Sequence, residues 1–409
     1  VLDNIKLSNG SIWPIPINLD VDDKFLESIN NEASITLRDK EGFAIAILDI
    51  ESKWKPNKEN EALKVYNTKN PEHPGVNYIL NHTHDWYLGG KIRNIQNSKH
   101  YDYVDLRLSP SRVKEKISEL GWDRLVAFQT RNPMHRAHVE ITRLAAKENN
   151  ANLLIHPVVG MTKPGDVDYF TRVRCYNKII KKYPDDSAML SLLPLSMRMA
   201  GPREALWHAI IRKNYGCTHI IIGRDHAGPG SDSDGNPFYG PYDAQKLLVK
   251  YQDTINIKMV PFKMMVYVKE KNEYMPIDEV PSDLTSLNIS GTDLRNKLDS
   301  GDSLPEWFTY PEIEKELKKS IPEKINRGIT IFFTGLSGSG KSTLANALLI
   351  KFLEEGNRPV TLLDGDLVRQ HLSSELGFSK EHRSINVKRI GYVASEITKN
   401  KGIAICAPI

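Results

Sequence analysis

The sequence has few of the features that mark secreted or membrane proteins. It contains three cysteines in 409 residues, Cys175, Cys217 and Cys406, and no two of them form a CxxC pair. This scarcity excludes a disulfide scaffold and indicates a reducing compartment. No apolar run approaches the roughly 18 residues of a membrane span, and no signal peptide is visible. We therefore expect a soluble cytoplasmic protein without a membrane partner. A targeting segment upstream stays open, because the chain begins at Val1 rather than Met.

An excess of charge of one sign is also missing. Lys and Arg number 55 against 51 Asp and Glu, a formal net charge of +4. A balance this even gives no argument for a nucleic-acid partner, so basic residues have to be judged by their local setting. The length of 409 residues exceeds what one hydrophobic core usually serves, and it indicates two to four domains.

Residues 1–102 have the pattern of a small β-rich domain. Short apolar or alternating runs at Ile12–Leu19, Ser34–Leu37 and Phe43–Ile50 are separated by turn signals such as Asn9-Gly10. The helical pattern Ser111–Leu120 then leads into the next domain.

From Leu125 to Phe262 the chain alternates apolar runs with amphipathic stretches. The predicted strands are Leu125–Phe128, Asn152–His156, Met189–Leu195, His219–Gly223 and Ile257–Phe262. The predicted helices are His135–Lys147, Tyr169–Lys181, Pro202–Lys213 and Pro241–Tyr251. Such alternation predicts a parallel α/β sheet whose sites lie beyond the carboxyl ends of its strands. Three charged loops fall there: Gln129–Asn132, His156–Asp166 and Gly223–Gly230.

The first loop joins a strand to a helix within the stretch Val126–Arg143. Unpartnered amides and the positive end of the dipole at a helix start favour an anion. His135 and His138 are three residues apart, so they share a face of the first turn, and Arg131 precedes them. We expect the two imidazoles and the guanidinium to converge on one spot. A pair of surface histidines is the plainer interpretation, and zinc lacks Cys or carboxylate partners nearby.

The loop Gly223–Gly230 interleaves small residues with Arg224, Asp225 and His226. Its backbone N–H groups can approach an anion while a cation faces it, although an ordinary surface turn has a similar composition. Farther along, residues 263–327 are punctuated by prolines. The segment Asn288–Arg295 predicts a helix start with Ser290 or Thr292 as N-cap, and Lys315–Arg327 reads as a charged helix and linker.

A second anion site is predicted near the C-terminus. Ile329–Phe333 reads as a buried strand, Gly335–Ser342 fits G-x-x-x-x-G-K-[ST], and Thr343–Glu355 has a helical pattern. In such a loop glycines let the backbone wrap a phosphate, Lys341 bridges phosphates and Ser342 ligates Mg²⁺. The predicted loop residues are Gly335, Ser337, Gly338, Ser339, Gly340, Lys341, Ser342 and Thr343. Further strands are expected at Val360–Leu363 and Gly402–Ala407.

Most of residues 1–327 resemble ATP sulfurylase. The string Q-T-R-N-P-M-H-R-A-H at Gln129–His138, the string M-R-M-A-G-P-R-E-A at Met197–Ala205, and W-P-I-P-I at Trp13–Ile17 carry the resemblance in the family's order. It implies an α/β multidomain fold: a barrel-like β-rich domain (1–102), a Rossmann-like nucleotidylyltransferase domain (103–262) and a small connecting α/β domain (263–327).

The resemblance also implies roles for individual residues. Sulfate is bound by Gln129, Arg131 and the backbone of Ala227. ATP is bound by Gln129, Thr130, Arg131, Asn132, Gly223, Arg224, Asp225, His226, Phe262 and Met265. Thr130, Arg131 and Asn132 are catalytic, and His135 and His138 stabilise the transition state. Because nucleotidylyltransferases often carry I-S-x-T-x-x-R at a phosphate-facing helix, Arg295 is a candidate phosphate contact, with helix capping as the default interpretation of that segment.

Residues 328–409 resemble an adenosine 5′-phosphosulfate (APS) kinase, a P-loop fold. The resemblance implies APS binding by Asp364, Asp366, Arg369, Phe378, Arg383 and Asn386, with Asp364 as base or metal partner. One departure is His382, where the family usually has an acidic residue. The other is the end of the chain at Ile409, before the family's lid and further strands, which indicates either a truncation or a remnant domain.

The sequence therefore predicts sulfate activation. ATP and sulfate give APS and pyrophosphate with Mg²⁺, and the C-terminal domain phosphorylates APS to 3′-phospho-APS (PAPS) if it is complete; a homo-oligomer is expected. Three alternatives stay open. The C-terminal domain could bind nucleotide only as a regulator, the chain could transfer AMP to another acceptor such as a nicotinamide or pantetheine phosphate, or it could bind nucleotide without catalysis.

Overall fold

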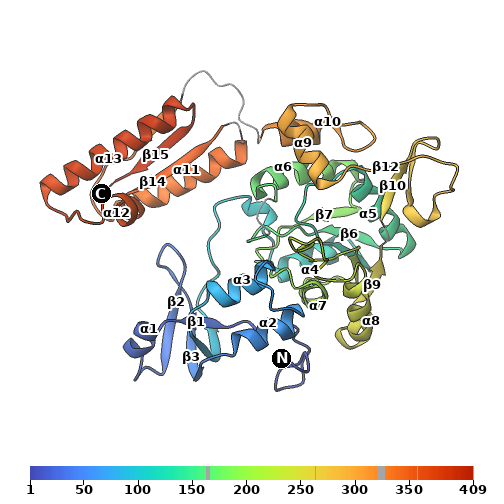
Figure 1. The fold of residues 1–409 in the computed structure, drawn as a ribbon, viewed down its shortest axis with the longest axis horizontal. Helices are drawn as coiled ribbons and strands as arrows, with labels where there is room; N and C mark the ends of the chain where they lie inside the picture. The colour runs from blue at the N-terminus through green and yellow to red at the C-terminus, as the bar shows by residue number, and fades with distance from the viewer. Residues whose placement is uncertain (163–165, 263, 320–327, 357, 409) are drawn as a thin grey trace.

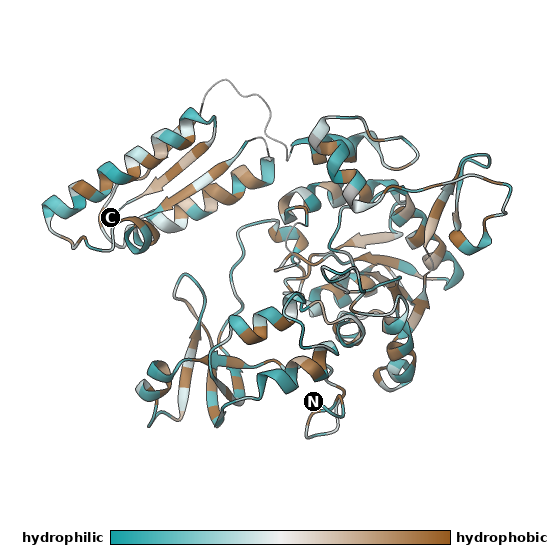
Figure 2. Ribbon diagram, in the orientation of Figure 1, coloured by the Kyte–Doolittle hydropathy of each residue, from teal (hydrophilic) through white to brown (hydrophobic). Residues whose placement is uncertain are grey.

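The computed structural model describes residues 1–162, 166–262, 264–319, 328–356 and 358–408. Among these residues the strands form four sheets that follow one another along the chain (Figure 1). Hydrophobic residues lie along the strands of the sheets and on the helices packed against them, and Figure 2 shows them as brown bands. No helix in the described part of the chain is both long and apolar enough to cross a membrane.

The N-terminal sheet is antiparallel, with the order β1-β4-β3-β2. Its strands are β1 (Leu19–Val21), β2 (Ser34–Arg38), β3 (Ala44–Trp54) and β4 (Trp86–Asn94), accompanied by helices α1 (Asp23–Ser28), α2 (Lys58–Tyr66) and α3 (Pro74–Asn81). Of the apolar run Ile12–Leu19, which contributed to the predicted β-rich pattern, only Leu19 lies in a strand. Pro14 and Pro16 interrupt this run, and because proline has no N–H to donate, the segment cannot form a regular ladder.

The central sheet is parallel, as predicted, and its strands lie in the order β7-β6-β5-β8-β9. Its strands are β5 (Leu125–Phe128), β6 (Asn152–Ile155), β7 (Ala188–Leu190), β8 (His219–Ile222) and β9 (Lys258–Pro261). The associated helices are α4 (Pro110–Glu119), α5 (Arg136–Glu148), α6 (Tyr169–Ile179), α7 (Gly201–Asn214) and α8 (Asp243–Ile255), with 3₁₀ turns η1 (Val104–Leu106) and η2 (Ile180–Lys182). The strand predicted at Met189–Leu195 ends at Leu190, where the backbone leaves the ladder: the Leu192 N–H donates to the Leu106 carbonyl, 2.8 Å away.

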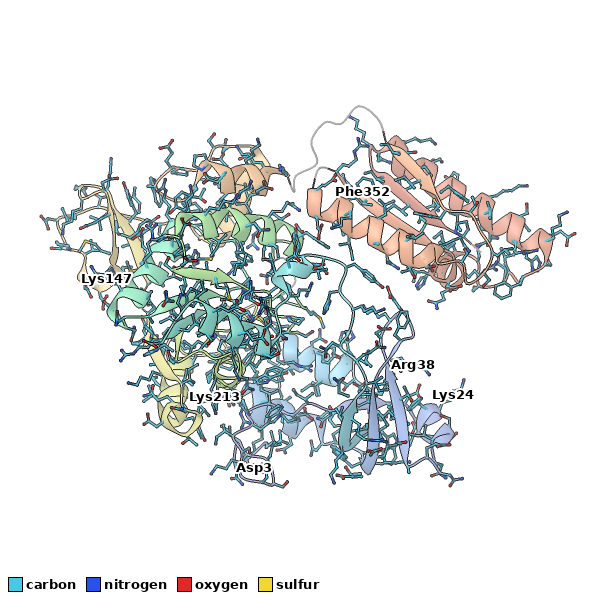
Figure 3. The ribbon with its side chains drawn as sticks, turned by 180° about the vertical axis from the view of Figure 1, so that it is seen from behind. Asp3, Lys24, Arg38, Lys147, Lys213 and Phe352 are labelled. Atoms are coloured by element: carbon cyan, nitrogen blue, oxygen red, sulfur yellow. The ribbon has the colours of Figure 1, made fainter. Side chains whose placement is uncertain are left out.

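Both faces of the central sheet are buried at β5, where all four residues are buried. Successive residues of a strand point to opposite faces, so β5 contributes to two cores. Val126 and Phe128 join a core with Val139 of α5 and Val173 of α6. Leu125 and Ala127 join the opposite core, which includes Val113 of α4, Leu206 of α7 and Leu248 of α8. Near the last turns of α5 and α7, Lys147 and Lys213 stay at the surface (Figure 3), where cations favour the negative end of the helix dipole.

The connecting region adds a small antiparallel sheet, β11-β10-β12, to the same core. Its elements are β10 (Met265–Val268), β11 (Glu273–Pro276), η3 (Ile277–Glu279), β12 (Ser286–Leu287), α9 (Gly291–Ser300) and α10 (Pro311–Lys319). Ser290 is the N-cap of α9, one of the two predicted candidates, and its hydroxyl accepts from the Asp293 N–H at 3.1 Å. The predicted helix and linker at Lys315–Arg327 is helical to Lys319, and the remainder lies outside the described residues.

The C-terminal sheet is parallel, in the order β13-β15-β14. It comprises β13 (Ile329–Phe332), β14 (Val360–Asp364) and β15 (Ile403–Ala407), with α11 (Lys341–Glu355), α12 (Gly365–Leu372) and α13 (Lys380–Lys399). The predicted strand at Ile329–Phe333 is present but not buried, since Ile329 and Phe332 remain 46% and 42% exposed. The buried strand is β15, which pairs on both sides.

The C-terminal sheet is attached to the central one through α6. The Arg174 guanidinium on α6 donates to the Leu353 carbonyl near the end of α11 at 2.7 Å, and it lies 3.2 Å from the Glu316 carboxylate on α10. The Glu354 carboxylate accepts from the Tyr103 N–H at 2.8 Å. A cation at the C-terminal end of a helix is favourable because the last carbonyls lack partners inside the helix.

Candidate functional site

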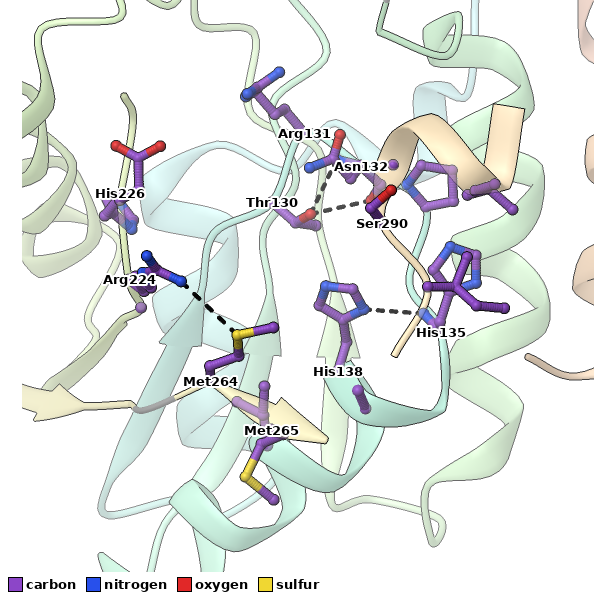
Figure 4. A pocket seen from close by; sticks show the side chains of 18 of the residues that line it. Thr130, Arg131, Asn132, His135, His138, Arg224, His226, Met264, Met265 and Ser290 are labelled. Atoms are coloured by element: carbon purple, nitrogen blue, oxygen red, sulfur yellow. Dashed lines mark hydrogen bonds between the residues drawn. The ribbon is translucent and has the colours of Figure 1, made fainter. Parts of the chain in front are cut away.

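A cleft of about 530 Å³ opens at the carboxyl ends of β5 and β8 (Figure 4). Residues from the loops after these strands, from the start of α5 and from α9 line it. It gathers all residues that the sequence assigned to sulfate, ATP or catalysis: Gln129, Thr130, Arg131, Asn132, His135, His138, Gly223, Arg224, Asp225, His226, Ala227, Phe262 and Met265, and also Arg295. Segments more than a hundred residues apart therefore share one site, as the parallel topology predicts.

The loop after β5 is held by its own hydrogen bonds and by α6. The Thr130 hydroxyl donates to the Asn132 carbonyl at 3.0 Å and accepts from the Asn132 N–H at 3.1 Å. From α6, the Tyr176 hydroxyl donates to the Asn132 carbonyl at 2.7 Å, and the buried Arg172 guanidinium donates to the Arg131 carbonyl at 2.9 Å. The backbone that carries the predicted catalytic residues is thus fixed before any ligand binds.

Arg131 does not meet the imidazoles as the sequence led us to expect. Its guanidinium pairs with the carboxylate of Asp166, and Figure 4 shows it on the far side of Thr130 from His138. Both side chains of this pair are largely buried, with 20% and 12% exposed. Breaking a largely buried ion pair by removing one partner is costly, so an anion that binds Arg131 would have to replace or share the Asp166 carboxylate.

The two histidines lie at the beginning of α5, where His135 is the N-cap. The His135 ring stacks on Phe308, with 4.4 Å between centroids, and its Nδ1 lies 2.9 Å from the Thr309 hydroxyl. Nδ1 of His138 accepts from the His135 N–H at 3.1 Å. A neutral His138 therefore carries its proton on Nε2.

Burial makes both imidazoles neutral in the ligand-free cleft. It lowers the pKa of His135 to about 3, with a smaller contribution from His138, and it lowers the pKa of His138 to about 4. Neutral rings can still donate one N–H each to a phosphate oxygen. Among the described residues, no group of three or more His, Cys, Asp or Glu side chains is placed to hold a metal ion.

The backbone N–H groups at the start of α5 are less available to bind an anion than the sequence led us to expect. The His135 N–H is bonded to His138, the Arg136 N–H donates to the Phe308 carbonyl at 3.2 Å, and the His138 N–H donates to the His135 carbonyl at 3.0 Å. The helix dipole still favours an anion here, but side chains have to provide more of the donors than the sequence suggested.

The loop after β8 has an unusual backbone. Asp225 and Ala227 adopt φ of 50° and 58°, in the left-handed region that costs non-glycine residues energy. Such conformations turn successive amides toward a common point and form concave anion sites. Gly228 lets the Asp225 carboxylate approach closely, because a Cβ there would lie 1.9 Å from it and would displace that side chain. The Arg224 guanidinium reaches toward Met264, with 3.9 Å between Nη1 and Sδ.

Sequence reasoning missed several residues of the cleft. Asp166, Met197, Met264 and Phe308 line it beside the predicted ones. Asp166 ends a charged loop that was already placed at this edge of the sheet, so its position gave a usable signal. Phe308 and Met264 carried none, because they come from the proline-punctuated region that folds back over α5.

The C-terminal glycine-rich loop forms a second phosphate-binding geometry. Gly335, Gly338 and Gly340 have φ of 147°, 77° and 83°, values that only glycine adopts readily. Lys341 is buried, and its ammonium donates to the carbonyls of Gly335 at 3.0 Å and Leu336 at 2.8 Å. The ammonium thus lies across the loop, near the concave path that a phosphate would take.

The other predicted kinase residues surround this loop only in part. The Ser342 hydroxyl donates to the Asp364 carboxylate at 2.7 Å. The Arg369 guanidinium lies 4.5 Å from the centre of the Phe378 ring, and Arg383 is exposed. Asn386 is buried, and both polar atoms of its side chain lack a hydrogen-bond partner in the described part of the chain. His382, the departure from the family pattern, accepts from the Gly377 N–H at 2.8 Å and so holds the G-F-S turn.

Three family models match successive parts of the chain. They are a PUA-like domain at residues 1–97, ATP-sulfurylase at residues 104–320 and adenylylsulphate kinase at residues 327–409. The second match covers more than half of the chain. This chain belongs to the ATP-sulfurylase family.

Individual relatives agree with this assignment. A sulfate adenylyltransferase of Chaetomium globosum is 51% identical over 407 residues, which span 99% of this chain and 71% of the relative. One of Yarrowia lipolytica is 51% identical over 412 residues, 100% of this chain and 72% of the relative. Among solved structures, a hexameric APS kinase from Thiobacillus denitrificans matches with a TM-score of 0.65 and 39% identity, over 100% of this chain and 73% of that chain.

The matches confirm the family resemblance and the multidomain α/β fold class, including an APS kinase-like part that is partial. They do not assign roles to single residues, so the site assignments stay predictions. The same holds for the boundaries 1–102, 103–262, 263–327 and 328–409; the ATP-sulfurylase match runs through residue 263 without a break.

The depressed imidazole pKa values predict how stability depends on pH. In the unfolded chain an imidazole takes up a proton below pH ~6.5, whereas folded His138 stays neutral until about pH 4, so its contribution to stability is lost as pH falls through that window. When pH falls from 6.5 to 5, we expect His138 to lower the free energy of unfolding by about 2 kcal/mol. The decrease in the free energy of unfolding over this range should be smaller in His138→Asn. Urea denaturation at the two pH values measures the difference; identical pH dependence of both proteins would contradict it.

Proposed function

We propose that the cleft catalyses the reaction of ATP with sulfate to give APS and pyrophosphate. The observation that carries the proposal is that the Q-T-R-N and G-R-D-H-A loops, separated in sequence, line one cleft in a member of the ATP-sulfurylase family. A sulfate oxygen forms a bond to the α-phosphorus, the bond from that phosphorus to the bridging oxygen breaks on the opposite side, and pyrophosphate leaves with the electron pair.

The chemistry fits a site without a protein nucleophile. Sulfate is a weak nucleophile, and negative charge develops on the α-phosphate and the leaving pyrophosphate. Positioning together with donors aimed at that charge can provide most of the rate enhancement. Arg131 suits sulfate because its planar fork donates two parallel hydrogen bonds, with Gln129 and the Ala227 backbone as further donors.

His135 and His138 would serve the leaving group. Phosphate oxygens close to a buried imidazole favour its protonated form, so ATP should raise both pKa values from their depressed ligand-free range. Protonation would then coincide with the presence of the charge that has to be stabilised. Mg²⁺, held by the β- and γ-phosphates, supplies further neutralisation when it enters with ATP.

We further propose that the C-terminal unit binds a second nucleotide and, as a complete domain, phosphorylates APS to PAPS. The specific observation is the glycine loop with Lys341 folded across it and Ser342 beside Asp364. The hydroxyl and carboxylate oxygens of Ser342 and Asp364 are hard ligands that suit Mg²⁺. A unit that only binds nucleotide as a regulator is the competing proposal. The expected homo-oligomer stays a prediction.

The first experiment removes the sulfate fork. Arg131→Ala should lower sulfate-dependent pyrophosphate release by at least about 100-fold, because a charge-assisted bidentate pair is lost, and Arg131→Lys should not restore it. Arg143→Ala, on the exposed side of α5, is the matched control and should retain activity. Turnover within tenfold of the wild type at saturating sulfate would place the site elsewhere. Pyrophosphate release without sulfate would favour another acceptor.

The second experiment separates leaving-group stabilisation from ATP binding. In His135→Ala and His138→Ala the turnover number should fall by about 10²–10³-fold, more than the KM for ATP rises, since the interaction strengthens in the transition state. Steady-state kinetics with varied ATP at saturating sulfate measure both quantities. If ATP affinity is lost while turnover is unchanged, the histidines act in ground-state binding instead.

The third experiment tests whether the two nucleotide sites act separately. In the full-length protein, Lys341→Ala should abolish APS-dependent ADP formation and leave sulfate-dependent pyrophosphate release within about twofold, because the lysine's positive charge is removed from the C-terminal phosphate site only. Lys351→Ala, an exposed lysine on the same helix, should change neither reaction. Loss of both reactions in folded Lys341→Ala would show that the units are obligately coupled. A wild-type protein that binds ATP but forms no ADP would favour the regulatory alternative.

A further inference from the structure

Helix α7 carries a polar stripe beneath the cleft. Glu204, His208 and Arg212 are spaced four residues apart, so they lie on one side of the helix, and each is 0% exposed. Their neighbour Lys213 is exposed (Figure 3). Burying a guanidinium costs several kcal/mol unless it is well paired, so its position calls for a specific partner.

That partner is a residue of the sulfate site. Nη2 of Arg212 donates to Oε1 of Gln129 at 2.5 Å and to the His156 carbonyl at 2.9 Å. Nε and Nη1 of Arg212 are buried and have no hydrogen-bond partner among the described residues. Burial lowers the pKa of Arg212 to about 10, which leaves the guanidinium charged at neutral pH.

The contact decides which end of the Gln129 amide faces the cleft. An amide can present either its oxygen or its NH₂ group, and only the second can bind an anion. A guanidinium has donors and no acceptors, so the Gln129 oxygen has to turn toward Arg212. The NH₂ group is then directed away from it, where its protein contact is Sδ of Met197 at 3.8 Å, which is a weak acceptor.

We propose that Arg212 is a positioning residue that acts through Gln129: it holds the amide oxygen and so presents the NH₂ group to sulfate. This inference rests on the proposed function, since it assumes that Gln129 binds sulfate in the cleft. The opposite orientation would place a carbonyl oxygen against the sulfate oxygens and weaken binding. Arg212 itself lies behind Gln129 and does not line the cleft.

A purely structural role for Arg212 makes different predictions. Its bond to the His156 carbonyl links α7 to the end of β6, and loss of that bond would lower stability and affect both substrates alike. Loss of amide orientation would instead raise the KM for sulfate only while Gln129 is present, and any effect on ATP would likewise depend on Gln129. A double-mutant cycle on the two residues separates these cases.

The experiment measures KM for sulfate and for ATP in pyrophosphate release for the wild type, Gln129→Ala, Arg212→Met and the double variant. We expect Arg212→Met to raise the sulfate KM about tenfold or more, to raise the ATP KM no more than Gln129→Ala does, and the double variant to match Gln129→Ala. Arg203→Met is the matched control. It removes another partly buried arginine of α7, one that bonds the carbonyls of Leu2 and Pro14, and it should leave the sulfate KM unchanged.

The outcomes are distinguishable. If Gln129→Ala leaves the sulfate KM unchanged, the proposed sulfate site is wrong. If Gln129→Ala raises it but Arg212→Met does not, or if the two effects multiply in the double variant, the positioning role is overturned and the sulfate site stands. A rise in the KM for ATP that exceeds the one seen in Gln129→Ala would also overturn it.

A second comparison covers the case in which Arg212→Met fails to fold. In Gln129→Glu the new carboxylate still pairs with Arg212, whereas in Gln129→Ala the guanidinium loses that partner. We expect the melting temperature of Gln129→Glu to equal or exceed that of the wild type and that of Gln129→Ala to be lower, while sulfate KM rises in both. Equal losses of stability in the two variants would mean that Arg212 does not hold this residue, and the inference would fail.

Discussion

The complete burial of β5 is the constraint on which the site depends. Its four residues alternate between two cores, one shared with α5 and α6 and the other with α7 and α8. A strand buried on both sides has a firmly set register, because a shift of one residue would exchange the two cores. The loop from Gln129 to Asn132 therefore leaves the sheet at a fixed point. The loop after β8 leaves beside it because the two strands pair in parallel.

Around this point three ionisable side chains of the cleft are either paired or neutral. Arg131 is paired with Asp166, and the imidazoles of His135 and His138 are neutral because burial disfavours their charged forms. Substrate anions would change both conditions, by competing for Arg131 and by raising the imidazole pKa values. The proposed contribution of Arg212 is different, since its guanidinium is charged at neutral pH although burial lowers its pKa, and it lies outside the lining of the cleft.

The two proposed phosphate sites use different backbone conformations to curve the chain around a phosphate. In the C-terminal unit, three glycines adopt positive φ and let the chain curve around a phosphate. In the sulfurylase cleft, Asp225 and Ala227 adopt positive φ although they are not glycines, which stores strain at the site. Both loops follow parallel strands, β13 and β8, so the sheet edge supplies the location and the loop supplies the donors.

The sequence by itself determined the order of the main elements and those cleft residues that directly follow strands β5 and β8. Alternating apolar runs predicted the parallel sheet, and strands with strong apolar character, such as Leu125–Phe128, matched to the residue. The site residues near Gln129 and Gly223 could be predicted because they follow strands directly. The run Ile12–Leu19 contributes only Leu19 to a strand because its two prolines lack backbone donors, whereas Ile329–Phe332 forms a strand as predicted but with partly exposed side chains among the described residues.

Only the tertiary structure decided how these residues are held. The pairing of Arg131 with Asp166, the stacking of Phe308 on His135 and the contact of Arg212 with Gln129 each join segments at least 35 residues apart. Local sequence patterns carry information about neighbours at helical or strand spacing, whereas these contacts depend on how helices pack across the sheet. The pKa values of the histidines follow from the same packing, because the desolvation that lowers them exists only when the distant segments close over the cleft.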